Sequence, residues 1–455
     1  MASTRLTRTV QSGGNRAKWT WSAWVKRAKL GATQTLFAAH ADSNNKTRLE
    51  IAADDELYFN DESGGNTNGR IVSTQKFRDT FGWMHIVAVW DKDNSTGDDR
   101  ILYYVNGTRI TSFSDTGNAP SGDSTMNNSS VTHEIGSENS GNYFSGYMSH
   151  IHFCDGYAYA ASDFGEADSN GVWKIKTSPS VSYGTTGYFI LKNGNSVTDQ
   201  SGNSNNWTVA AGNLTNDKDN PSDVFATMNN LDALFPTHAT SSSFANCNTE
   251  IQTGTGSSSS NGYSYNNATI AVSTGKFYWE IKPTNVGGSS FIGIISESQI
   301  YNQNLSEITN SNAYAWTIRN SNGNVRNNNS NITYAASYTA NDIIGVALDL
   351  DNNKLYFSKN GVWADGSGAW GSSTFDAAVG AITITAAAST ESGFYFPTVG
   401  ASDYATASTF QTNFGNGRFG TNAISSAGTN ASNNGVFEYD VPANFTALCT
   451  KGLNS

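Results

Sequence analysis

The chain has 455 residues and a net charge of −11, with 27 Lys and Arg against 38 Asp and Glu. A chain of this length exceeds one hydrophobic core and suits two domains of about 200 residues each. The acidic balance argues against a nucleic-acid partner, because phosphate binding needs clustered basic side chains. The residues from Met1 to Arg8 lack an apolar signal core, and no run reaches the ~18 apolar residues of a membrane span, so we expect no membrane insertion.

The composition predicts an all-β protein with long polar loops. Gly occurs 44 times, aromatic residues make up 12% of the chain, and Asn, Ser and Thr are abundant. The three cysteines, Cys154, Cys247 and Cys449, are odd in number and far apart, which argues against a disulfide framework and favours folding in a reducing cytoplasm.

The first clear strand is Lys18–Lys26. Its alternation places Thr20, Ser22, Trp24 and Lys26 on one face and apolar residues on the other. We expect the basic run that follows to be a solvated strand edge. Further strands are predicted at residues 35–39, 47–52, 56–60, 83–90, 101–105, 147–153 and 187–191, with a helical turn at 158–164.

The pattern weakens after residue 200 and resumes with strands at 263–272, 277–282, 290–296 and 313–318. We therefore predict two antiparallel β-sandwich domains of jelly-roll-like form in tandem. Their expected limits are residues 1–200 and 246–455, joined by a connecting segment at 201–245.

A hairpin signature occurs once in each half. Asn106-Gly107 and Asn360-Gly361 each follow a strand rich in aromatic residues. Asn and Gly both tolerate the positive φ that a tight primed turn requires. Each half is therefore predicted to contain a two-residue hairpin.

Four blocks of the first half resemble the concanavalin A-like, laminin-G-type sandwich. They are residues 21–26, 82–91, 103–107 and 144–151, in the family's order. The blocks that follow, at 153–156, 163–166 and 171–173, resemble an extension of such domains in bacteriophage structural proteins.

The second half resembles a SPRY domain, through the blocks 275–280, 291–294, 342–349, 359–361 and 394–399. The tandem order, with Asn-rich loops and the tail Phe445–Thr450, is similar to virion proteins of marine, cyanophage-like bacteriophages. The resemblance implies a virion protein, made and assembled in the host cytoplasm, with other virion proteins as partners and a homo-oligomeric state.

Tryptophans beside polar side chains are candidates for glycan contacts, because sugar C–H faces stack on aromatic rings. Trp24 in the first domain and Trp316 and Trp363 in the second are the predicted ligand-binding residues. The alternative is that each ring belongs to a sandwich core or an interface.

The acidic loop that begins at Asp91 supplies hard oxygen atoms of the kind that Ca²⁺ prefers. Asp91, Asp93 and Asn94 are the predicted metal ligands, and no cofactor other than Ca²⁺ is expected. The alternative is a solvated acidic turn.

We predict no catalytic residues. A glycosidase needs two carboxylates on one face, and the nearest candidate set is Glu50, Asp54 and Glu56, in which Ala52 interrupts the acidic alternation. Asp54 and Asp55 fit better as the turn between two strands. We therefore expect a non-enzymatic virion surface protein, a component of a tail fibre or of a capsid-surface fibre or knob, that adheres to host or environmental glycans. The alternatives are a structural subunit without a ligand and a glycan-degrading enzyme.

Overall fold

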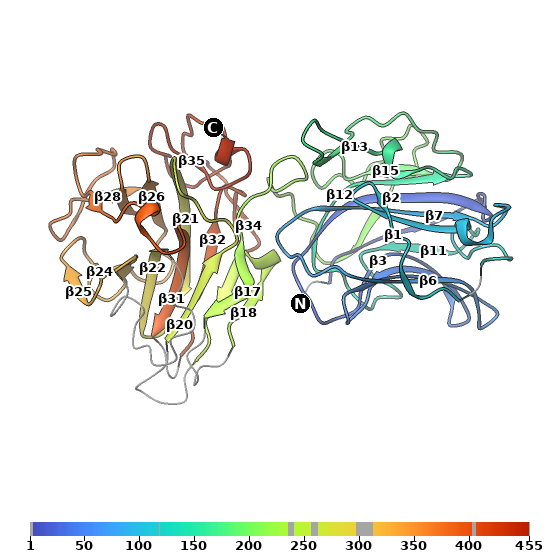
Figure 1. Ribbon diagram of the computed structural model, residues 1–455, viewed down its shortest axis with the longest axis horizontal. Coiled ribbons are helices and arrows are strands. Elements are labelled where there is room, and N and C mark those ends of the chain that lie inside the picture. Colours follow the sequence, from blue (N-terminus) through green and yellow to red (C-terminus); the bar gives the residue numbers. More distant parts are fainter. Residues whose placement is uncertain are drawn as a thin grey trace. The chain divides into compact units, whose positions relative to one another are not determined.

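The computed structural model describes residues 3–117, 119–234, 241–255, 263–296, 313–402 and 406–454. The chain divides into two compact units, one of residues 1–216 and 220–222 and one of residues 217–219 and 223–455. Both units are built from strands (Figure 1). The helices of the described residues are short 3-10 turns, and none is long and apolar enough to cross a membrane. The predicted all-β tandem of sandwiches is confirmed.

The described part of the first unit is a sandwich of two main antiparallel sheets. The eight-stranded sheet has the order β10 (Phe113–Asp115), β6 (Asn66–Lys76), β5 (Glu56–Ser63), β4 (Asn45–Ile51), β3 (Gln34–Asp42), β11 (Thr132–Ile135), β1 (Arg5–Thr9) and β16 (Thr208–Ala211). The six-stranded sheet has the order β15 (Tyr188–Ile190), β12 (Gly146–Asp155), β2 (Lys18–Arg27), β7 (Met84–Asp91), β8 (Ile101–Val105) and β9 (Thr108–Arg109).

The core of this unit lies between the two sheets, and the alternation of β2 decides which side chains enter it. Trp19, Trp21 and Val25 are buried in the core cluster. Their neighbours along the strand, Thr20 and Trp24, point to the outer face of the six-stranded sheet. The predicted parity of this strand is therefore correct.

A segment of the first unit's own chain covers that outer face. We call residues 157–183 the strap; it contains a 3-10 turn (Ala161–Asp163) and the strands β13 (Gly165–Ala167) and β14 (Trp173–Ile175) (Figure 1). Phe164 and Trp173 of the strap pack on Val87, Val89 and Cys154 of the sheet. The strap seals this face from solvent.

The described part of the second unit also forms a sandwich. Its seven-stranded sheet has the order β17 (Met228–Leu234), β20 (Tyr263–Ala268), β31 (Phe396–Ser402), β22 (Ser289–Ile295), β23 (Ala315–Arg319), β24 (Val325–Asn327) and β25 (Ser330–Ile332). The ten-stranded sheet comprises β18 (Ser243–Ala245), β19 (Glu250–Gln252), β32 (Thr409–Asn413), β21 (Lys276–Asn285), β26 (Ile344–Asp349), β27 (Lys354–Lys359), β28 (Val362–Ala364) and β29 (Trp370–Ser372), with β30 (Ile382–Thr383) beside β27 and β35 (Thr446–Ala447) parallel to β21.

The second unit likewise covers one outer face with its own chain. We call residues 436–449 the C-terminal cover. Phe437 and Phe445 of the cover pack on Tyr278, Tyr356 and Trp363 at the outer face of the ten-stranded sheet. Both sandwiches are thus extended by a third layer on one side.

Both Asn-Gly hairpins form as predicted, and they close in the same way. Asn106 Oδ1 accepts the backbone N–H of His85 at 2.8 Å, and Asn360 Oδ1 accepts that of Ile343 at 2.8 Å. The asparagines have φ of 46° and 50°, in the left-handed region that the turn demands. A short amide side chain is the reason that Asn suits this position, because it reaches the neighbouring strand.

The segment 201–245, which we expected to connect the domains, divides between the two units. β16 pairs with β1 of the first unit, and β17 pairs with β20 of the second. The segment carries strand pairs because Thr208–Ala211 and Met228–Leu234 each complete a sheet edge.

Candidate functional site

Trp24 does not present its ring to a ligand. The side chain faces away from the core as predicted, but the strap buries it to 4% exposure. The indole stacks on His85, with ring centroids 5.1 Å apart, and His85 in turn stacks on Trp173 of the strap. The prediction is wrong because the covering segment lies more than 130 residues further along the chain.

The two tryptophans predicted as ligand contacts in the second unit are also buried. Trp316 packs edge-on against Tyr395. Trp363 packs against Tyr278 and Phe375 beneath the C-terminal cover. Neither ring offers a face to a sugar, so the core alternative holds for all three tryptophans.

The predicted metal ligands do not converge. Asp91 Oδ2 pairs with Lys18 Nζ at 2.9 Å, and Asp93 pairs with Lys92. Asn94 Oδ1 accepts the backbone N–H of Thr96. Ammonium groups therefore occupy this acidic loop, and the described residues contain no cluster of three His, Cys, Asp or Glu suited to a metal ion.

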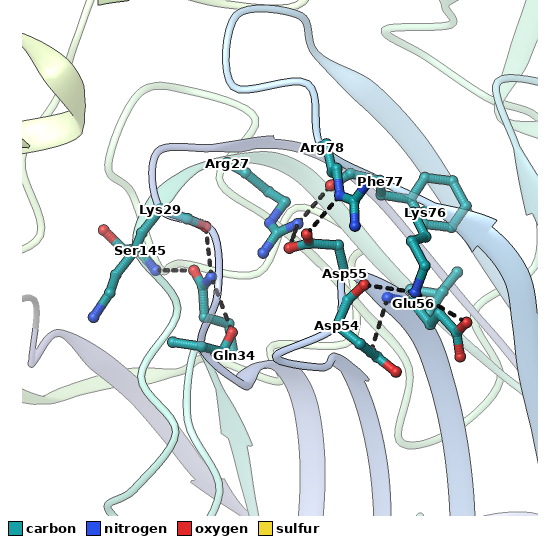
Figure 2. A network of polar contacts seen from close by, with 12 residues as sticks. Arg27, Lys29, Gln34, Asp54, Asp55, Glu56, Lys76, Phe77, Arg78 and Ser145 are labelled. Atoms are coloured by element: carbon teal, nitrogen blue, oxygen red, sulfur yellow. Dashed lines mark hydrogen bonds and ion pairs between the residues drawn. The ribbon is translucent and has the colours of Figure 1, made fainter. Parts of the chain in front are cut away.

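The basic run at the end of β2 is not a solvated edge. Arg27 is fully buried and donates to Asp55 Oδ1 at 3.0 Å and to the carbonyl of Phe77 (Figure 2). Arg78 Nε reaches the other oxygen of Asp55 at 3.0 Å. The expectation fails because Asp55, in the turn between β4 and β5, supplies a partner that local patterning cannot reveal. This network holds the end of the sandwich together.

The polar face of the eight-stranded sheet is the candidate site. On β4 the side chains of Leu49 and Ile51 enter the core, so Arg48 and Glu50 point outwards. Arg48 lies opposite Asn60 of β5, and Glu50 lies opposite Tyr58. These four residues, which we call the polar quartet, form the corners of a cross-strand rectangle of about 5 by 7 Å.

The polar quartet has hydrogen-bonding capacity that the protein does not use. Glu50 and Asn60 each retain 8% exposure. Glu50 Oε2, Asn60 Oδ1 and Arg48 Nε are buried without a hydrogen-bond partner. Buried polar atoms in native proteins are nearly always paired, so three such atoms in one rectangle, on the outer face of a sheet, make this face a candidate site.

Charges on this face are compensated. Arg48 pairs with Glu62 at 2.7 Å and with Glu138 at 3.6 Å, and Lys46 pairs with Glu62 at 3.4 Å. Further cross-strand ion pairs join Arg5 to Glu134, Arg70 to Asp115 and Lys76 to Glu56. Burial raises the pKa of the Glu50 carboxyl, and nearby Glu138 adds to the rise while Arg48 opposes it.

From the sequence, Glu50 is a candidate only as one member of a catalytic carboxylate set. The predicted turn at Asp54 and Asp55 is confirmed, since β4 ends at Ile51 and β5 begins at Glu56. The signal that could have found the quartet is the alternation of polar with apolar residues along both strands. This alternation identifies the face of the sheet on which the side chains lie, but not how deeply they are buried.

A tandem of two antiparallel β-sandwiches, each with a covering segment, defines the class of this protein. Residues 4–162 match the family model of the concanavalin A-like lectin/glucanases superfamily, and residues 276–417 match that of the SPRY domain. The chain therefore contains one domain of each kind, as its sequence blocks implied.

Several solved structures are similar to parts of the chain. The SPRY domain of human HERC1 is 15% identical, covering 41% of this chain and 96% of its own, with a TM-score of 0.30. A heptameric SAP-like pentraxin from Limulus polyphemus is 20% identical, covering 34% and 71%, with a TM-score of 0.26. A human SPRY domain is 13% identical, covering 39% and 96%, with a TM-score of 0.26. No curated protein matches the chain.

Proposed function

We propose that this chain is a non-catalytic carbohydrate-binding protein that acts in adhesion, with the polar quartet as its glycan contact. The observation that carries the proposal is the set of unpartnered atoms of Arg48, Glu50 and Asn60 on one sheet face. Sugar hydroxyls both donate and accept hydrogen bonds, so one ring can pair with a guanidinium, a carboxyl and an amide together.

The rectangle is about 5 by 7 Å between the bases of the side chains, a span that a single sugar ring can cover. Tyr58 supplies a half-buried aromatic ring at the fourth corner, with the Arg70 guanidinium 5.8 Å from its centroid. Because the unpartnered atoms lie just beneath the surface, a rotation of Arg48, whose side chain is 20% exposed, would give a ligand access to them.

Charge compensation on the face favours an uncharged glycan. Each basic side chain in the ion pairs of this face already has a carboxylate partner. A polyanion would have to displace that carboxylate, and the displacement would offset the electrostatic attraction that the polyanion gains. A neutral polysaccharide meets no such cost, because it uses only the unpaired hydrogen-bonding atoms.

We further propose a bacteriophage virion as the setting, with the chain in a tail fibre or a capsid-surface fibre or knob. The support is the resemblance of the tandem domains and their extension blocks to marine phage virion proteins. Repeated copies in a homo-oligomer would raise the avidity of weak single sites. Production in the host cytoplasm, with other virion proteins and a host surface glycan as partners, belongs to the same proposal.

The test compares retention of the purified chain on candidate host cells and on neutral and acidic surface polysaccharides, with and without chelator. Arg48→Met removes the guanidinium from the quartet and should weaken retention at least tenfold. Arg109→Met is the matched control, because Arg109 lies on the other sheet, outside the site, and likewise pairs with a carboxylate, that of Asp99. New reducing ends are measured in the same incubations.

Three results would contradict the proposal in different ways. Equal loss of retention in Arg48→Met and Arg109→Met would mean that the polar quartet does not bind the glycan. New reducing ends would favour an enzyme. Glu50, whose pKa is raised by burial, would then be the acid, and Glu138, which pairs with Arg48, would be the base. Absence of retention on every host and polysaccharide would favour a structural virion subunit.

A further inference from the structure

A short hairpin of the first unit borders the polar quartet at Arg48. It belongs to the connection between β11 and β12, and two backbone hydrogen bonds between Glu138 and Gly141, of 3.0 and 2.8 Å, close it. Asn139 and Ser140 at its tip are exposed and have φ of 45° and 63°, as a primed turn requires. We call residues 138–141 the acidic hairpin.

The acidic hairpin directs its carboxylate back onto the sheet. Glu138 Oε2 lies 3.6 Å from Arg48 Nη1, and Glu138 Oε1 lies 3.4 Å from His40 Nδ1. The Glu138 side chain is 9% exposed, whereas the tip of the hairpin faces solvent. One nitrogen of the Arg48 guanidinium therefore lies against a carboxylate that comes from outside the sheet.

Contacts other than those of Glu138 hold the hairpin in place. Ser140 Oγ accepts a hydrogen bond from Arg5, and the Ser140 N–H donates to Glu134 Oε2 at 3.4 Å. Ser137 Oγ donates to the same oxygen of Glu134, which lies on β11. Neutralisation of Glu138 should therefore remove a charge without releasing the hairpin.

Glu62 on β5 has a different role at the same guanidinium. Its Oε1 accepts hydrogen bonds from Arg48 Nη2 and Asn60 Nδ2, each at 2.7 Å, and so joins two corners of the quartet. Its Oε2 pairs with Lys46 at 3.4 Å. Because Glu62 holds Arg48 through Nη2, the guanidinium should keep its position when Glu138 loses its charge.

Glu138 completes the charge balance beside the quartet. Two cations, Lys46 and Arg48, face two carboxylates, Glu62 and Glu138. Neutralisation of Glu138 makes this cluster more positive by one charge, whichever form Glu50 takes, and leaves Arg48 Nη1 without its carboxylate. A guanidinium nitrogen in that state binds carboxylates well, so it would attract an acidic glycan.

We propose that Glu138 sets the selectivity of the polar quartet, because it excludes acidic glycans from Arg48 and leaves the contacts for neutral glycans unchanged. This inference rests on the proposed function of the quartet. The neutral contacts use Arg48 Nε, Glu50 Oε2 and Asn60 Oδ1, and none of these atoms is hydrogen-bonded to Glu138. An acidic sugar instead meets a like charge at Nη1, and such a repulsive element is a usual source of specificity.

The test measures retention of the full chain on two forms of one polysaccharide. The first form is the neutral polysaccharide that retains the native chain, and the second is the same polymer after oxidation of its primary hydroxyls to carboxylates. Glu138→Gln should leave retention on the neutral form unchanged and raise retention on the oxidised form about fivefold, the effect of roughly one accessible cation at an anionic surface. The gain should vanish at about 1 M salt, where the Debye length is about 3 Å.

Asp99→Asn is the charge-matched control, because it removes one negative charge and frees Arg109 on the other sheet. It should leave retention on both forms unchanged. Arg48→Met combined with Glu138→Gln should show no gain on the oxidised form, because the gain requires the guanidinium. Glu138→Ala is a second neutralising variant and should give the same result as Glu138→Gln.

Equal gains in Glu138→Gln and Asp99→Asn would overturn the proposal, since net charge would then set retention. Equal retention of the native chain on both forms would also overturn it, as would loss of neutral retention in both folded Glu138 variants. If the native chain binds the neutral form and neither Glu138 variant gains the acidic one, only the role of Glu138 falls. If the native chain binds no neutral polysaccharide, the proposed function falls together with this inference.

Discussion

The two sandwiches cover one outer face by the same device but anchor the covering segment with opposite chemistry. In each unit the covered sheet carries the Asn-Gly hairpin, and an aromatic ring of the covering segment rests on the hairpin glycine. A Cβ on Gly107 would lie 2.5 Å from the Trp173 ring, and one on Gly361 would lie 2.6 Å from that of Tyr439. The glycine in each turn therefore has two roles. It allows the positive φ, and its lack of a side chain allows the aromatic ring to pack directly on the backbone.

The anchors differ in the protonation state that they need. In the first unit, Trp173 Nε1 donates to His85 Nδ1 at 3.0 Å, and His85 Nε2 pairs with Ser22 Oγ at 2.8 Å, which requires a neutral imidazole. In the second unit, backbone N–H groups converge on the carboxyl of Glu280. Similar architecture can thus respond to pH in opposite directions, because the sign follows from the buried group.

The largest expected effect is an opposite response of the two units to acid. Burial lowers the pKa of His85 from 6.5 to about 3 and lowers that of His133 to about 4. A folded pKa below the unfolded one means that stability is complete above pH 6.5 and is lost as pH falls towards the folded pKa. For His85 alone the loss by pH 4 is about 3 kcal/mol. Glu280 has the reverse sign and favours the second unit below pH 7.

Peptide-resolved hydrogen exchange at pH 7 and pH 4.5 measures both responses in one chain. The amides of the strap and of β2 should lose protection at the lower pH, and those of the C-terminal cover should gain it. Parallel loss of protection in both units would break the comparison. His85→Phe, which cannot bind a proton, provides the control and should remove part of the acid sensitivity of the strap.

Substitution of Trp24 by Ala should destabilise the first unit by about 3 to 4 kcal/mol, because it removes a buried ring and its stacking on His85. Thermal unfolding monitored with peptide-level exchange should place the loss in the first unit. Glycan retention of the folded variant should remain unchanged, since Trp24 lies on the six-stranded sheet and the polar quartet lies on the eight-stranded sheet. Tyr157→Ala, at an exposed position of the strap, is the control and should cost less than 1 kcal/mol. Loss of retention with intact stability would restore Trp24 as a ligand contact.

The sequence predicted those features that short-range periodicity encodes. The parity of β2 and both hairpins followed from alternation and from the turn preference of Asn-Gly. The solvent exposure of the side chains did not follow from the sequence pattern, because it depends on segments that are distant in the chain. Lys26 is buried beneath the rings of Phe81 and Tyr147, which alternation within β2 cannot reveal.

The candidate site was predictable in part for the same reason. Alternation along β4 identifies Arg48 and Glu50 as outward-facing, but the raised pKa of Glu50 and its unpartnered oxygen arise from the packing of neighbouring strands. Tryptophans were predicted as ligand contacts because aromatic rings are common at sugar sites. In this fold the rings fill a third layer, and the polar quartet remains on the open face.

The smallest expected effect separates the two roles of the hairpin glycines. Gly107→Ala and Gly361→Ala each place a methyl group in a left-handed backbone and against an aromatic ring of the covering segment. Gly31 and Gly393 also have positive φ, of 69° and 76°, but a Cβ at either meets no atom within 4 Å. Ala at these control positions should cost only the backbone strain, about 1 kcal/mol.

The difference in free energy of unfolding between each hairpin variant and its control therefore measures the cost of crowding the aromatic ring. We expect an excess loss of about 1 to 2 kcal/mol in each unit, the usual cost of overpacking, in chemical unfolding resolved by unit. Exchange of the strap should rise in Gly107→Ala, and exchange of the C-terminal cover should rise in Gly361→Ala. Equal losses in hairpin and control variants would mean that the rings shift freely. The shared geometry would then hold the turns but not the covering segments, and His85 and Glu280 would be left as their anchors.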